Sequence, residues 1–203
     1  MLNFLKTRWF DIGAIIAFVI IKGIILNARL MGSIQSLLWL GFAALLLFQA
    51  EEYHWPGSYP EWLSRLSGKG KKSYRTPLTA NSNFIIHVLV QWTTFIVAAI
   101  LEEDALWLGM AVMIFCFGSF IKHTFYYNIK ARTWYNPGMA TSILCLLPVS
   151  AFFFREVVGK QKASLTDYLL GVPLGIFFTL VTSVEVINWI KSRHFQPAAP
   201  KHS

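Results

Sequence analysis

Two adjacent glutamates, Glu51 and Glu52, stand where a long apolar run, Leu37 to Leu47, comes to its end. A carboxylate at membrane depth is costly and usually faces the interior of a helical bundle or a wet cavity. The pair can also simply mark the point where a helix leaves the lipid. Which reading holds depends on whether other segments bring matching chemical groups to the same membrane face.

Four other apolar segments carry polar side chains that would meet these glutamates. The residues are Asp11, then Asn83, His87 and Gln91 at i, i+4 and i+8, Ser119 and His123 at i and i+4, and Thr182, Glu185 and Asn188 at i, i+3 and i+6. Such spacings place side chains on one helix face. The sequence therefore predicts a shared polar site, with Glu51, Glu52, His87, His123 and Glu185 as its catalytic residues.

Carboxylates and imidazoles together suit two chemistries. They are ligands for zinc, iron or manganese, or they act as an acid and a base with tuned pKa values. In the metal version, Glu51, Glu52, His87 and His123 are the expected ligands.

Composition assigns the chain to the membrane. Of its 203 residues, 55% are hydrophobic and 14% are charged, and the mean hydropathy is +0.51. Soluble domains carry about 25% charged residues. The formal net charge of +8 comes largely from short loops between apolar runs, which indicates orientation against the cytoplasm and not a nucleic-acid partner. Cys116 and Cys145 lie inside apolar runs and predict no disulfide.

The expected fold class is all-α, a bundle of six transmembrane helices. A helix needs about 20 mostly apolar residues to cross a bilayer, and six stretches meet this need, at roughly 10–27, 33–53, 83–101, 106–127, 138–155 and 165–190. We expect one transmembrane domain over residues 1–195, with a kink at Pro173 and a disordered tail over 196–203.

The distribution of cations predicts the orientation of this bundle. Loops on the side of the two termini hold twelve Lys and Arg residues, whereas the other side holds four, Arg29, Arg155, Lys160 and Lys162. Cations are enriched in cytoplasmic loops. Both termini, and with them the polar site, are therefore expected on the cytoplasmic side.

The loop before the fifth span offers a place for an anion. Asn136 is expected to cap that helix and Pro137 to be its first residue, so that free N–H groups and the positive end of the helix dipole receive a headgroup or a carboxylate. The same residues can also do no more than start a helix. We take Arg132, Tyr135, Asn136, Asn83 and Asn188 as candidate substrate-binding residues.

Several motifs resemble the HXXEE family, a group of small bacterial integral membrane proteins with a His-x-x-Glu-Glu motif. They are Glu51-Glu52-Tyr53 followed by Trp55-Pro56-Gly57, then His123, then Tyr135-Asn136-Pro137-Gly138. The resemblance covers roughly residues 35–190. It implies a multi-pass protein of the bacterial inner membrane, and it supports the location of the site more than an activity.

One position departs from the family pattern. The histidine of the motif falls on Phe48, and a phenyl ring neither binds metal nor moves a proton. His54, just past the helix end, is a candidate substitute. On a helix, position 48 lies one turn before Glu51 and Glu52, so its side chain is expected to point at the same site.

Three functions remain open on this sequence. The first is a membrane enzyme that acts on a lipid-like or hydrophobic small molecule at the cytoplasmic leaflet, with or without a metal. The second is a transporter or ion-conducting protein, although the polar residues crowd one leaflet and line no full path. The third is a non-catalytic membrane subunit or binding module, which the phenylalanine at position 48 favours.

Overall fold

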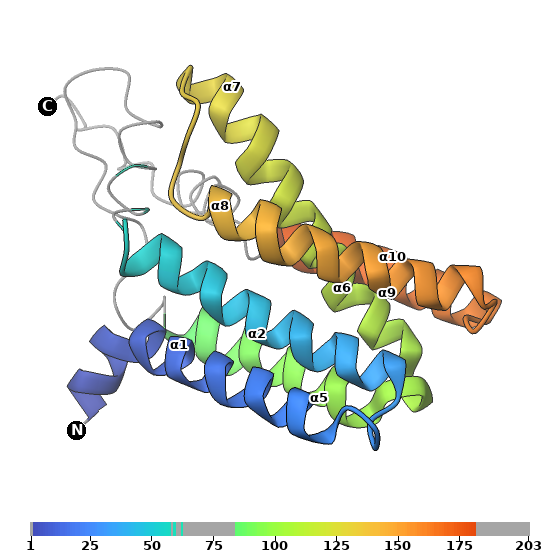
Figure 1. Cartoon of the computed structure of the whole chain (residues 1–203). Helices are drawn as coiled ribbons and strands as arrows, with labels where there is room; N and C mark the ends of the chain where they lie inside the picture. The colour runs from blue at the N-terminus through green and yellow to red at the C-terminus, as the bar shows by residue number, and fades with distance from the viewer. Residues whose placement is uncertain (1, 58, 60–61, 63–83, 182–203) are drawn as a thin grey trace, which may run out of the picture.

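The computed structural model describes residues 2–57, 59, 62 and 84–181. Its elements are α1 (Leu2–Asn27), α2 (Ser33–Tyr53), the π-helical η1 (Ile85–Trp92), α5 (Thr93–Leu101), the 3-10 turn η2 (Glu102–Ala105), α6 (Leu106–Ile121), the π-helical η3 (Lys122–Tyr126), α7 (Tyr127–Ala131), α8 (Met139–Thr141), the π-helical η4 (Ser142–Leu146), α9 (Leu147–Gly159) and α10 (Leu165–Val181). The all-α fold class is confirmed for this part of the chain (Figure 1). The expected tail, 196–203, lies outside the described residues.

Within the described residues, four helices are long and apolar enough to cross a membrane: Phe4–Asn27, Ser33–Tyr53, Ile85–Ala131 and Met139–Gly159. Leu165–Val181 is apolar but shorter. The stretch Ile85–Ala131 folds back at η2, where Glu102 has φ 49° and Ala105 leaves the helical region, and α5 then packs against α6. Three consecutive acidic residues at this turn keep it out of the lipid.

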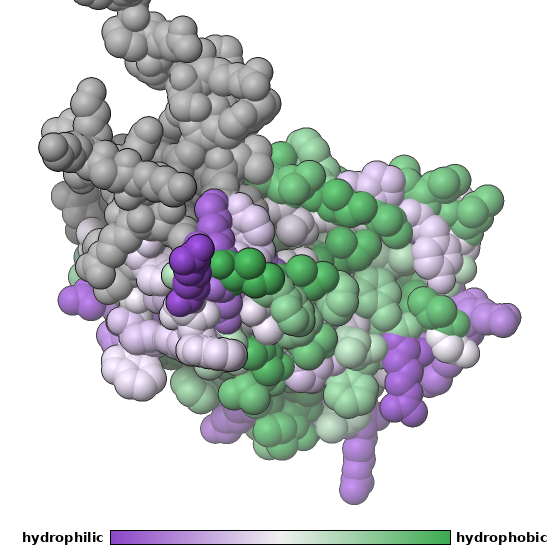
Figure 2. Space-filling view, turned by 90° about the horizontal axis from the view of Figure 1, so that it is seen from above, coloured by the Kyte–Doolittle hydropathy of each residue, from purple (hydrophilic) through white to green (hydrophobic). Residues whose placement is uncertain are grey.

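The outer faces of the helices are apolar. Large exposed hydrophobic side chains include Phe18 and Leu26 on α1, Ile100 on α5, Phe152 on α9 and Phe177 on α10. Figure 2 shows such side chains as a broad hydrophobic band, with hydrophilic side chains toward either side of it. Apolar surface of this extent fits lipid contact, and together with the candidate spans it identifies a multi-pass membrane protein.

Helix α2 is the centre of the bundle. It packs against α1, α5, α6 and α9, and it begins and ends where the sequence predicts, at Ser33 and Tyr53. Close approach to α6 depends on Gly41, where an added Cβ would lie 2.5 Å from Met113 Cε. Because α2 is surrounded, the carboxylates at its end are held inside protein and not in lipid.

The α6–α10 pair has its own packing device. Gly171 and Gly175, four residues apart, face the α6 backbone, with an added Cβ 2.6 Å from Trp107 O and 2.9 Å from Ala111 O respectively. Small residues at this spacing let transmembrane helices approach closely. Pro173 lies between them inside α10.

Three π-helical segments interrupt the regular helices, and they hold His87, His123 and Ser142. Such widened turns recur at functional sites because they re-aim side chains. The segment η4 directly precedes α9, whose second residue is Pro148, and the ring of a proline would clash with the carbonyl group four residues earlier in a regular α-helix.

Candidate functional site

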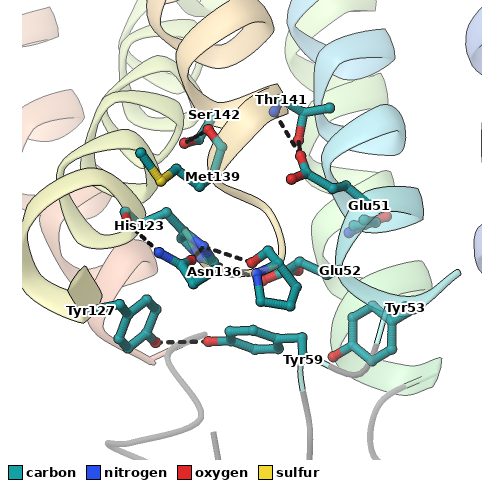
Figure 3. A network of polar contacts seen from close by, with 12 residues as sticks. Glu51, Glu52, Tyr53, Tyr59, His123, Tyr127, Asn136, Met139, Thr141 and Ser142 are labelled. Atoms are coloured by element: carbon teal, nitrogen blue, oxygen red, sulfur yellow. Dashed lines mark hydrogen bonds and ion pairs between the residues drawn. The ribbon is translucent and has the colours of Figure 1, made fainter. Parts of the chain in front are cut away.

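The two motif glutamates point at different partners, although they are adjacent on α2. Glu51 accepts four hydrogen bonds from the beginning of the Met139–Gly159 helix and the loop before it, and Figure 3 shows its contact with Thr141. Its Oε1 accepts from Tyr135 Oη at 2.7 Å and from the Ala140 N–H at 3.1 Å. Its Oε2 accepts from Thr141 N–H at 2.6 Å and Thr141 Oγ1 at 2.5 Å. Glu51 is thus a clamp between two helices.

This clamp replaces the expected helix cap. Asn136 does not cap the helix and Pro137 is not its first residue, because Gly138, with φ +94°, precedes a helix that begins at Met139. These N–H groups donate to the chain's own Glu51 carboxylate, in the place where a bound headgroup or carboxylate was expected. A charged acceptor satisfies the orphan N–H groups and the helix dipole better than a neutral amide does.

Tyr135 serves this clamp from the loop before the helix. Burial, and next the hydrogen bond to Glu51, raise the pKa of its phenol above the ordinary value, so the hydroxyl keeps the proton that it donates. Arg132 lies in the left-handed region at the end of α7, with φ 53°, and its side chain is exposed.

His123 is fixed in one orientation by the same loop. Its Nδ1 lies 2.8 Å from Asn136 Oδ1 and 3.0 Å from the Pro137 carbonyl oxygen. The Asn136 amide nitrogen in turn donates to the His123 carbonyl oxygen at 2.6 Å and to Asn128 Oδ1 at 2.8 Å. Since Asn136 Oδ1 and the Pro137 carbonyl can only accept, we assign the hydrogen to His123 Nδ1. Nε2 then carries a lone pair in the neutral ring.

Glu52 faces that lone pair. Its Oε1 lies 3.4 Å from His123 Nε2, and the two side chains are 5% and 0% exposed. Among the described residues, His123 Nε2 has no hydrogen-bond partner, which is rare for a buried polar atom and calls for an explanation. The expectation that a motif glutamate lies within reach of His87 or His123 is confirmed by this pair.

Glu52 also lines a pocket between α2, η1 and α6. The lining residues are Phe48, Glu52, Tyr59, His87, Gln91, Phe115, Ser119 and Lys122. The cavity volume is about 20 Å³, room for about one water-sized group, and the pocket opens to the outside. The predicted faces of the third and fourth spans, with His87 and Gln91 on one and Ser119 on the other, therefore meet at this pocket.

His87 takes part in a separate network. Its Nδ1 lies 2.9 Å from Gln91 Oε1 and its Nε2 lies 3.0 Å from Tyr53 Oη. The ring stacks on Trp9 with a centroid distance of 5.0 Å. Gln49 completes the network by donating to Gln91 Oε1 at 2.8 Å. Both ring nitrogens of His87 are therefore engaged by neutral groups, as in a structural histidine.

Tyr59 and Phe48 close the site from two sides. The Tyr59 ring lies 5.6 Å from the His123 ring, and its hydroxyl bonds that of Tyr127 at 2.7 Å. Burial raises the pKa of Tyr59 well above its ordinary value, so this phenol stays neutral. Phe48 meets His123 edge-on at 5.0 Å, which confirms that position 48 points at the same site.

Other predicted members lie elsewhere. Asp11 pairs with His54 Nδ1 at 2.5 Å and with Arg8 Nη1 at 3.2 Å, so neither Asp11 nor His54 joins the pocket. The reason is that α1 packs on the far side of α2 from His123, next to Trp92. Asn83, Glu185 and Asn188 lie outside the described residues.

The expected metal ligands do not converge. Among the residues that the structure describes, no three His, Cys, Asp or Glu side chains lie close enough to hold one metal ion. Glu51 accepts hydrogen bonds from another helix and His87 bonds Tyr53 and Gln91. Of the four predicted ligands, Glu52 and His123 remain as a possible two-donor site, which is fewer than the three protein ligands of a catalytic zinc.

Several residues of the site were not predicted from the sequence. Lys122 lies inside an apolar run, where an ionisable residue is itself a sign of function. Gln49 is likewise a polar residue inside an apolar run, which also indicates a buried polar contact. Tyr59 and Thr141 gave no such signal, because a loop tyrosine and a threonine near a helix start are common.

Comparison with protein-family models gives a match over residues 39–153, to proteins of unknown function with an HXXEE motif. No curated protein and no solved structure matches the chain. The matched region is more than half of the 203 residues. It contains Glu51 and its hydrogen-bond donors, the Glu52–His123 pair, and the loop 132–138 that contacts both glutamate sites. The chain therefore belongs to the HXXEE family, with phenylalanine at the position of the motif histidine.

Proposed function

We propose that this protein is an integral membrane enzyme that moves a proton on a hydrophobic, lipid-like substrate, as an isomerase does, with Glu52 and His123 as acid and base. The single observation that carries the proposal is the buried Glu52–His123 contact of 3.4 Å at a pocket. A positioned acid and base contribute roughly 10²- to 10⁴-fold to a rate.

The hydrogen bonds around the pair support this chemistry. With its hydrogen on Nδ1, His123 can accept a proton at Nε2, and Glu52 is the nearest group to give or take it. One proton can therefore pass between carboxyl, imidazole and a substrate atom in the pocket. Asn136 and Pro137 hold the ring through the exchange, as the orienting group does in other catalytic histidines.

We further propose six crossings, with both termini and the site on the cytoplasmic side of a bacterial inner membrane. Asp11 contacts His54, and Glu51 contacts Thr141. The helix ends that carry these residues therefore lie together at one end of the bundle. At the other end, Gln35 contacts Glu102 and Lys162 contacts Glu103. The alternation of ends along the described helices, with the cation bias of the loops, supports this topology.

Metal-assisted chemistry is the second version of the proposal, and Phe48 is the position that tests it. Replacing Phe48 by histidine adds an imidazole beside Glu52 and His123, which gives three donors for zinc, iron or manganese. We expect Phe48→His to raise the metal bound per protein from near zero toward one, measured by elemental mass spectrometry after metal loading and desalting. Phe152→His, on the lipid-facing side of α9, is the matched control. A variant as metal-free as the parent protein contradicts the metal version.

Replacing Glu52 by glutamine tests the acid–base version. Glutamine keeps the size of the side chain but cannot exchange a carboxyl proton. Purified protein in nanodiscs is incubated with bacterial membrane lipids and polyprenyl or sterol-like compounds in D₂O. We expect products that carry solvent deuterium with the parent protein, detected by mass spectrometry, and at least a roughly hundredfold lower yield with Glu52→Gln.

The control for this experiment is Glu103→Gln, the same chemical change at an exposed position on the opposite end of the bundle. It is expected to behave as the parent protein. Equal deuterium incorporation by Glu52→Gln and the parent, or none by either, overturns the proposal and leaves the transport and non-catalytic functions.

A further inference from the structure

We infer that the pocket beside Glu52 binds one exchangeable water molecule, through which the Glu52–His123 pair takes up and releases solvent protons. The role of this water rests on the proposed function, whereas the water site itself depends only on the geometry of the pocket. The observations that carry the inference are the volume of the cavity, the polar groups in its wall, the contact of Glu52 with His123 and the opening of the pocket beside Lys122.

The cavity has the size of one water molecule. Its volume is about 20 Å³, and a cavity needs roughly 10–15 Å³ of such space to hold a water. A ligand of several heavy atoms does not fit unless the wall moves. Cavities of this size that stay empty in proteins are apolar, so the chemistry of the wall decides whether this one is hydrated.

Most of the wall is polar. Six of the eight described lining residues carry a polar or ionisable side chain, and they are Glu52, Tyr59, His87, Gln91, Ser119 and Lys122. A buried water makes about three hydrogen bonds to such groups. The Glu52 carboxyl group on α2 and the Ser119 hydroxyl group on α6 offer partners from two sides, and a water molecule, which both donates and accepts, can bridge them. The pocket therefore fits a bound water.

Glu52 joins this water to the proposed acid–base pair. It lines the pocket, and its Oε1 lies 3.4 Å from His123 Nε2. Because Asn136 and Pro137 engage Nδ1 of the buried ring, His123 exchanges protons at Nε2, on the side of Glu52. A D₂O molecule in the pocket gives one deuteron to the pair through the Glu52 carboxyl group and takes the proton of the pair away as HOD, so that no net charge moves.

The pocket opens beside Lys122. This residue is half-buried, whereas the other seven described lining residues are buried. Its ammonium nitrogen lies 5.9 Å from the centre of the Tyr127 ring on α7, so the side chain extends toward the end of the bundle that is cytoplasmic in the proposed topology. Because the cavity holds one small group, the water and the reacting atom of a substrate would occupy it in turn.

X-ray radiolysis of the protein in nanodiscs tests the water site without a substrate. Irradiation splits bound water, and the hydroxyl radical labels the side chains beside it, which peptide fragmentation in a mass spectrometer assigns to single residues. We expect label on Phe115, which is 3% exposed and lines the pocket. Phe153 is the internal control and should stay unlabelled, because it is 0% exposed and packs in the hydrophobic core away from the lining residues. An unlabelled Phe115 overturns the inference.

Heavy-oxygen water shows whether the bound water exchanges with solvent. The protein is mixed rapidly with this water just before irradiation. Because the pocket opens to the outside, the label on Phe115 should carry heavy oxygen to the same extent as the label on Trp134, which is 94% exposed. A label on Phe115 that contains only ordinary oxygen indicates a sealed water and overturns the proton route.

One substitution locates the water. Ser119→Leu fills the cavity, so it is expected to remove the label on Phe115 and to lower deuterium incorporation as far as Glu52→Gln does, by roughly a hundredfold or more. Thr93→Leu, at an exposed position of α5, is the control and should behave as the parent protein. Persistent label or full deuterium incorporation in a folded Ser119→Leu protein contradicts the inference. If that variant does not fold, the contrast between Phe115 and Phe153 in the parent protein decides.

Water binding and catalysis fail separately in this design. Glu52→Gln keeps the size of the side chain and a polar group in the wall, so Phe115 should be labelled as in the parent protein while deuterium incorporation is lost. If Phe115 is unlabelled and Glu52→Gln is inactive, the proposed function stands and the water route falls. If Phe115 is labelled and Glu52→Gln is fully active, the water site stands, and the acid–base function falls together with the proton route.

Discussion

Replacing Glu51 by glutamine is expected to lower the free energy of unfolding by about 3–5 kcal/mol. The carboxylate accepts two hydrogen bonds from side-chain hydroxyls and two from backbone N–H groups. A glutamine presents one oxygen and one NH₂ group, so the NH₂ meets donors instead of acceptors. Thermal unfolding of the purified protein in detergent, followed by circular dichroism, measures the loss.

The adjacent residue provides the matched control for this change. Glu52→Gln alters the same type of side chain one position away, where the contact shown is the 3.4 Å approach to His123 Nε2, so we expect a much smaller loss of stability. Thr141→Val combined with Glu51→Gln should lose less than the sum of the two single changes, because both break the same contacts. Equal stability of Glu51→Gln and Glu52→Gln contradicts the clamp.

The division between Glu51 and Glu52 follows from helix geometry. At 3.6 residues per turn, neighbouring side chains point about 100° apart, so two adjacent carboxylates on a surrounded helix meet different neighbours. Sequence reasoning treated them as one pair because their residue type is the same. This angle predicts that Glu51 and Glu52 have different neighbours. Only the fold shows that Glu51 faces the Met139–Gly159 helix and that Glu52 faces His123.

The predictable parts of the fold depend on hydropathy. The bounds of α2 and the return of the chain at Glu102–Ala105 follow from apolar runs that end in polar residues. The π-helical turns at His87 and His123 do not, because they arise from tertiary packing and leave no period in the sequence. Likewise, the pairing of Asp11 with His54 depends on how α1 lies against α2.

The clamp and the reactive pair are physically linked through one short loop. Tyr135 donates to Glu51, while the next two residues, Asn136 and Pro137, accept from His123 Nδ1. Gly138 completes the link, because an added Cβ there would lie 2.8 Å from Phe48 Cε2 and 2.9 Å from His123 Nδ1. A structural glutamate thereby fixes the loop that orients the proposed base, which gives Glu51 a positioning role in addition to its effect on stability.

Replacing His123 by alanine is expected to reduce deuterium incorporation into the substrate by roughly 10²- to 10⁴-fold. The fully buried ring is the proposed base, and its removal leaves a space bounded by Phe48, Tyr59 and Asn136. Added imidazole can enter that space and accept the proton, so it should restore part of the activity in His123→Ala and none in Glu52→Gln.

A purely structural His123 gives a different pattern. Its loss would lower the melting temperature and the activity together, and imidazole would restore neither or both. His123→Gln, which keeps a side chain against Phe48 and Tyr59, separates the two roles: we expect near-parent stability with activity as low as in His123→Ala. An active His123→Gln protein would show that no proton passes through this position. The proton would then have to move between Glu52 and the substrate directly, with His87 and Lys122 among the other ionisable groups in the described pocket wall.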